Sequence, residues 1–112
     1  MKDNPMTRTI LPQRRPSENI RAEWSGHRFH VTVGYHPATG QVMEVFYADG
    51  MKSGTDLRSM AEDACVLISL LLQNGVGIED VGKSLGRAPA FGKDAPASIV
   101  GAIVEAVAGG GG

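Results

Sequence analysis

Near Gly54, the spacing of apolar residues along this sequence changes from one regular period to another. Before Gly54, apolar and polar residues alternate, which is the period of half-buried strands. After it, apolar residues recur every three or four positions, which is the period of a helix that packs on a core. Strands that precede helices in this way predict an α+β domain.

Three stretches show the strand pattern, at residues 19–24, 27–35 and 42–48. Ser25-Gly26 is a typical two-residue turn between the first two, and the segment 36–41, HPATGQ, is a typical loop. Sequential short strands with tight links predict a three-stranded antiparallel β-meander. We expect Trp24 to belong to its core.

One long helix is predicted between Gly54 and Gly75, followed by two short helices within residues 77–86 and 96–108. The segment between these two, RAPAFGKDAP at residues 87–96, is predicted to be a loop. We expect the meander to pack against the long helix through one apolar stripe. The stripe consists of Leu57, Met60, Ala61, Ala64, Ile68, Leu71 and Leu72.

The second half of the long helix is apolar on nearly all sides, because Val66, Leu67 and Leu70 lie off the stripe. A helix of this kind needs cover on more than one side. The later helices or a second copy could supply that cover. We expect a homodimer, with Leu67 and Leu70 nearest its interface, and the alternative is a monomer whose terminal helix covers this side.

Length and composition indicate one small domain. The 112 residues divide into an extended basic arm at 1–18, a domain at 19–108 and a flexible glycine tail at 109–112. Eleven basic against 12 acidic side chains exclude a strong overall field of either sign. The apolar run at residues 64–72 is too short to span a membrane and the N-terminus does not resemble a signal peptide, so we expect a cytoplasmic protein.

Lys52, Ser53, Gly54 and Thr55, at the start of the long helix, form a candidate anion-binding turn. The glycines of a nucleotide-binding phosphate loop are not in place, so an NTPase is rejected. Helix capping by Ser53 or Thr55 is the favoured interpretation.

Candidates for metal binding and catalysis are few. His27, His30 and His36 have no carboxylate or cysteine placed to complete a metal site, and we expect them to face solvent. The single cysteine, Cys65, excludes an internal disulfide and fits a reducing compartment. It is predicted to be a small buried apolar residue. No catalytic residue, metal or cofactor is predicted.

The basic residues of the arm offer an alternative function. Arg8, Arg14, Arg15 and Arg21 could contact phosphates of a nucleic acid. Four cations on a short arm would bind weakly and in a salt-dependent way, so an arm that folds against the acidic body is favoured.

Several motifs resemble the TSCPD domain. They are the Val-Thr-Val-Gly strand at 31–34, the Glu-Val-Phe strand at 44–46, the Lys-Ser-Gly entry at 52–54 and the helix end LISLLLQNGV at 67–76. The lead-in ILPQRRPSE and the terminal helix ASIVGAIVEAV are similar to stand-alone forms of that family. The resemblance covers residues 8–108. It implies kinship with the C-terminal domain of adenosylcobalamin-dependent (class II) ribonucleotide reductases.

One departure limits what this resemblance implies. The Thr-Ser-Cys-Pro-Asp motif that names the family is absent, and Cys65 is followed by Val66-Leu67. Ribonucleotide reduction needs several cysteines and a barrel that holds substrate and cobalamin. We therefore expect a non-catalytic accessory module with no cofactor of its own. It would be associated with ribonucleotide reductase or deoxyribonucleotide metabolism through an unidentified protein partner.

Overall fold

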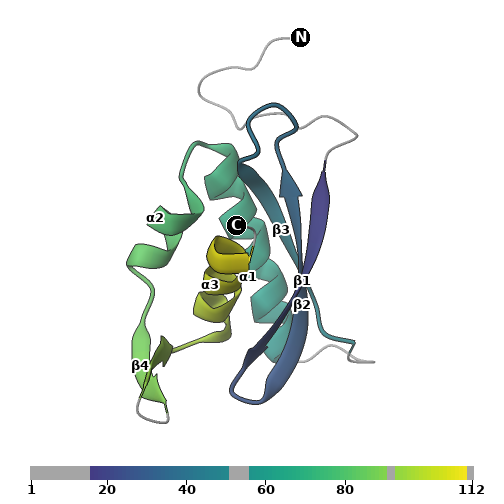
Figure 1. The fold of residues 1–112 in the computed structure, drawn as a ribbon. Coiled ribbons are helices and arrows are strands. Elements are labelled where there is room, and N and C mark those ends of the chain that lie inside the picture. Colours follow the sequence, from purple (N-terminus) through teal and green to yellow (C-terminus); the bar gives the residue numbers. More distant parts are fainter. Residues whose placement is uncertain (1–15, 51–55, 91–92, 111–112) are drawn as a thin grey trace.

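The computed structural model describes residues 16–50, 56–90 and 93–110. Figure 1 shows a three-stranded sheet with helices on one of its sides. In chain order the elements are β1 (Ser17–Trp24), β2 (His27–Tyr35), β3 (Val42–Ala48), α1 (Asp56–Gln73), α2 (Ile78–Lys83), β4 (Arg87–Ala90), β5 (Lys93–Pro96) and α3 (Ile99–Gly110). The predicted α+β class, the antiparallel sheet and the three helices are confirmed.

The sheet has the order β1-β2-β3, so β1 and β3 are its two edges. Ser25 and Gly26 both have positive φ, 52° and 78°, as a tight hairpin turn with the twist of the flanking strands requires. The register places Val31 of β2 beside Ile20 of β1 and Tyr47 of β3. The apolar halves of all three strands therefore share one face, and β1 begins at Ser17, slightly before the predicted strand.

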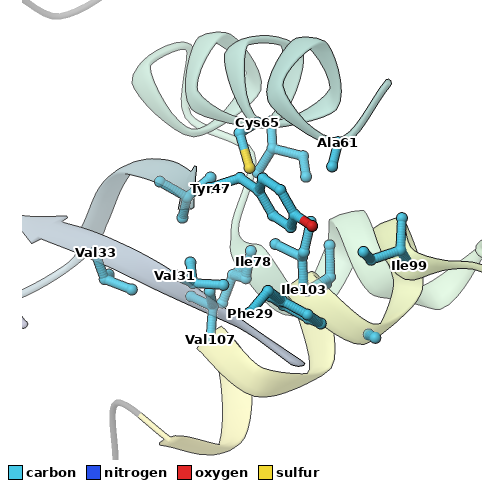
Figure 2. Packing of buried hydrophobic residues seen from close by; sticks show 14 of the residues in the cluster. Phe29, Val31, Val33, Tyr47, Ala61, Cys65, Ile78, Ile99, Ile103 and Val107 are labelled. Atoms are coloured by element: carbon cyan, nitrogen blue, oxygen red, sulfur yellow. The ribbon is translucent and has the colours of Figure 1, made fainter. Parts of the chain in front are cut away.

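Two helices, and not one long helix alone, pack against this face. α1 lies against β3, whereas α3 packs on β1 and to a lesser extent on β2. Figure 2 shows their side chains meeting those of β2 and β3 in one cluster, with Phe29 and Ile103 among the fully buried ones. Trp24 is half-buried against this core, as its alternation predicted.

The prediction of a loop at 87–96 was wrong, because β4 and β5 form an antiparallel hairpin there. Long-range contacts hold it in place. The Arg87 guanidinium contacts the carboxylates of Asp94, at 3.1 Å, and Glu105 of α3, at 2.9 Å. The indole Nε1–H of Trp24 donates to the Pro96 carbonyl oxygen at 3.1 Å. A short hairpin of this kind depends on such contacts more than on local propensity.

The orientation of α1 also differs from the prediction. Its buried apolar residues are Ala61, Cys65, Ile68 and Leu72. Met60 and Leu71, which were assigned to the buried stripe, are 67% and 45% exposed. No helix among the described residues is long and apolar enough to cross a membrane.

Candidate functional site

The most conspicuous surface of the molecule is apolar and lies on the outer side of α1. Met60, Leu67 and Leu71 recur at intervals of seven and four residues, so they form one line along the helix. Leu67 is 62% exposed, and Val66, which points about 100° further round the helix, is 58% exposed. We call Met60, Val66, Leu67 and Leu71 the α1 apolar surface. Large contiguous apolar patches on protein surfaces mark interaction sites, whereas single exposed apolar residues are ordinary.

A groove of about 350 Å³ continues this surface toward the sheet. It runs between α1 and β3, and Leu70 and Val66 line it from the helix. Phe46 lines it from the strand, with half of its side chain exposed. Val66 belongs both to the groove and to the α1 apolar surface. Leu70, which also lines the groove, is half-buried.

Two polar side chains of α1 explain why the helix presents its apolar residues outward. Ser69 Oγ accepts a hydrogen bond from the Val45 N–H at 2.9 Å and donates to the Val45 carbonyl oxygen at 3.3 Å. Gln73 Nε2 donates to the Met43 carbonyl oxygen at 3.1 Å. These bonds satisfy backbone groups on the outer edge of β3 that the sheet leaves unpaired. With these bonds in place, Leu67 and Leu71 are exposed to solvent.

A polar cluster lies at the end of the sheet from which the chain proceeds to α1. Tyr47 donates its hydroxyl hydrogen to Asp49 Oδ2 at 3.0 Å, and His27 Nε2 lies 2.7 Å from the same hydroxyl. With the hydroxyl hydrogen directed to Asp49, the tautomer of His27 that completes the cluster has its hydrogen on Nε2 and donates it to Tyr47. The Asp49 carboxylate is 1% exposed, and its hydrogen bonding meets the need of a buried charge for partners.

Burial and the hydrogen bond to Asp49 raise the pKa of Tyr47 far above its usual value. The cluster thus keeps Tyr47 neutral and holds the sheet end in one arrangement. It also shows that His27 does not face solvent as predicted, because its side chain is only 25% exposed.

Of the predicted anion site, Lys52, Ser53, Gly54 and Thr55 lie outside the described residues, as do Arg8, Arg14 and Arg15 of the predicted nucleic-acid set. Arg21 is described, and it is exposed on the sheet face that lies away from the helices. Within the described ranges, no group of three or more His, Cys, Asp or Glu residues is arranged to hold a metal ion.

Cys65 is buried, as its position on the helix predicted. Burial, and to a lesser extent the nearby Glu62 carboxylate, raises the pKa of the Cys65 thiol to about 12. A thiol that remains protonated at neutral pH is a poor nucleophile. Leu67 and Leu70, the predicted interface residues, both lie on the outer side of α1 or on its flank.

Sequence reasoning missed Phe46 and Met60 as surface residues. It also missed the edge contacts of Ser69 and Gln73. Ser69 did carry a signal, since it interrupts an otherwise apolar run, whereas nothing local distinguished the exposed Phe46 from a core residue.

No curated protein and no solved structure matches the chain significantly. One family model, the TSCPD domain, matches residues 5–108, which is nearly the whole chain. The resemblance seen in the motifs is therefore confirmed, and the chain belongs to the TSCPD domain family.

Proposed function

We propose that this chain is a TSCPD-type interaction module that pairs with a second copy of itself through the α1 apolar surface. The observation that carries the proposal is the line of Met60, Leu67 and Leu71, which is exposed although the same helix has a complete buried face. Full burial of one such side chain stabilises by about 1.5–3 kcal/mol. A symmetric pair would bury two sets, enough to offset part of the entropy cost of association.

The spacing along α1 favours a second copy as the occupant. In an antiparallel two-fold pair centred between Ala64 and Leu67, Met60 faces Leu71 of the second copy and Ala64 faces Leu67. Large side chains then alternate with a small one across the seam, as interdigitated helix packing requires. Residues 60, 64, 67 and 71 also follow the four-three-four spacing of a coiled-coil seam.

The biological setting that we propose is an accessory role alongside ribonucleotide reductase, without catalysis by this chain alone. The family assignment supports kinship with that enzyme, and the buried Cys65, the one cysteine of the sequence, does not suit radical chemistry. We expect no ribonucleotide turnover by the purified chain with a reductant. A measured turnover would contradict the accessory role without affecting the dimer.

Light scattering coupled to size exclusion at micromolar concentration tests the dimer. The protomer has a mass of 11.8 kDa, and we expect about twice that value. Leu67→Glu should return the mass to that of one protomer while the far-ultraviolet circular dichroism is retained. Ala108→Glu is the matched control, because it adds the same charge to an exposed apolar residue of α3. A monomeric wild-type chain, or a Leu67→Glu dimer, would refute the proposal.

A further inference from the structure

The two edge strands of the sheet differ in whether side chains bond to their outward-pointing backbone groups. On β3, Ser69 and Gln73 bond to the outward backbone groups of Val45 and Met43. The hydrogen bond from the Tyr35 N–H to the Pro16 carbonyl oxygen sets the alternation on β1, so that the backbone groups of Asn19, Arg21 and Glu23 point away from β2.

Among the residues that the structure describes, these outward groups of Asn19, Arg21 and Glu23 have no hydrogen-bond partner. All three residues are exposed. An unpaired row of this kind can pair with another strand, and most proteins cover it or block it with proline or a bulge. β1 has no proline, and its pairing with β2 runs without a bulge from Ser17 to Trp24.

A groove of about 700 Å³ lies beside this edge. Its walls are β1, the inner side of α3 and the end of the β4–β5 hairpin, and small side chains such as Ala22, Ala102 and Ala106 line it. A strand added next to β1 would direct every second side chain into this space. The other side chains would lie beside Arg21 and Glu23 on the sheet face away from the helices.

We propose that the open edge of β1 binds an extended peptide segment of a protein partner as a fourth, antiparallel strand. The peptide would alternate apolar, basic, apolar, acidic and apolar residues. Its basic residue would lie opposite Glu23 and its acidic residue opposite Arg21, as cross-strand charge pairing favours. Its apolar residues would enter the groove next to Ala22. Main-chain hydrogen bonds supply the binding and the groove supplies the selectivity.

The segment Ile20–Trp24 itself has this alternation, so a second copy could in principle pair with β1. The position of α3 disfavours that occupant. α3 packs over β1, the edge strand itself. Two-fold pairing of β1 with its copy would bring both α3 helices to the same side of adjacent strands. Neighbouring strands lie about 4.8 Å apart, whereas packed helices need about 8–10 Å between their axes. A single peptide strand carries no helix, so its addition next to β1 avoids this clash between helices.

This inference deepens the proposed interaction role but uses a different surface from the α1 apolar surface. The test uses the full chain and a capped, fluorescein-labelled peptide with the sequence Thr-Val-Lys-Val-Glu-Val-Thr. We expect saturable binding by fluorescence anisotropy with a Kd below about 1 mM. Amide exchange at Asn19, Arg21 and Glu23 should slow at least about tenfold at saturation, because these groups become hydrogen-bonded.

Two controls separate strand addition from charge attraction. The same peptide with methylated amide nitrogens at its lysine and glutamate should not bind, because those amides donate to β1. A peptide with lysine and glutamate exchanged should bind about tenfold more weakly, since two attractive cross-strand pairs become repulsive. The double variant Arg21→Glu with Glu23→Arg should reverse this preference.

Several outcomes would overturn the inference. They are no binding at 1 mM peptide, equal binding of the methylated peptide, or a double variant with unchanged preference. Concentration-dependent protection of the same β1 amides without peptide would show that a second copy is the occupant instead. Leu67→Glu should leave peptide binding intact while it abolishes the dimer, so failure of one proposal is distinguishable from failure of the other.

Discussion

Replacing Ser69 by alanine tests how α1 is held against the edge of β3. The change removes the hydroxyl that accepts a hydrogen bond from the Val45 N–H at 2.9 Å and donates one to the Val45 carbonyl oxygen at 3.3 Å. A backbone group left unsatisfied in a partly buried place costs about 1–3 kcal/mol. Because alanine has a higher helix propensity than serine, it offsets about 0.5 kcal/mol of this cost. The net loss in the free energy of unfolding should therefore be about 0.5–2.5 kcal/mol.

Urea unfolding followed by circular dichroism, at one fixed protomer concentration, measures this loss. Ser59→Ala is the matched control, since Ser59 is an exposed serine on the same helix. It should be neutral or slightly stabilising. Ser69→Thr keeps a hydroxyl and should recover most of the loss. Hydrogen exchange should locate the effect, with the Val45 amide exchanging faster in the alanine variant than in the wild type.

The reasoning would be refuted if Ser69→Ala and Ser59→Ala unfolded at the same urea concentration. It would be refuted equally if the Val45 amide exchanged at the wild-type rate in Ser69→Ala. Either result would mean that packing of Ile68 and Leu72 alone sets the position of α1.

Three further predictions concern buried contacts. With a pKa of about 12, the Cys65 thiolate fraction at pH 8 is on the order of 10⁻⁴, so Ellman's reagent should label the native chain far more slowly than the chain in urea. Trp24→Phe should cost about 1–2 kcal/mol, because the Pro96 carbonyl oxygen loses its donor, and amide exchange of the β4–β5 hairpin should increase most. A methyl group at Gly34 would lie 2.8 Å from Glu44 Cγ, so Gly34→Ala should destabilise by about 1–3 kcal/mol in urea unfolding. The same substitution in a Glu44→Ala background should cost clearly less, and an equal cost would contradict the predicted clash.

Elements whose apolar period repeats several times can be predicted from neighbouring residues alone. The alternation through Phe29, Val31 and Val33 is a property of neighbouring residues, and so is the two-residue turn at Ser25-Gly26. The burial of Cys65 followed from its place on the helix beside Ala61 and Ile68. The TSCPD resemblance also rested on local motifs, and the family model that matches residues 5–108 confirms it.

Features that depend on contacts between residues far apart in the chain could not be predicted in this way. The β4–β5 hairpin looks like a loop because Pro89 and Pro96 weaken its strand pattern, and it is held by Arg87 through Glu105, 18 residues away. The rotation of α1 depends on bonds from Ser69 and Gln73 to β3, 24 and 30 residues earlier. The alternation of residues in β1 and β3 does not tell which of these two edge strands has its outward backbone groups bonded by helix side chains. That depends on where α1 docks, because its Ser69 and Gln73 lie beside β3 and bond to the backbone of Val45 and Met43.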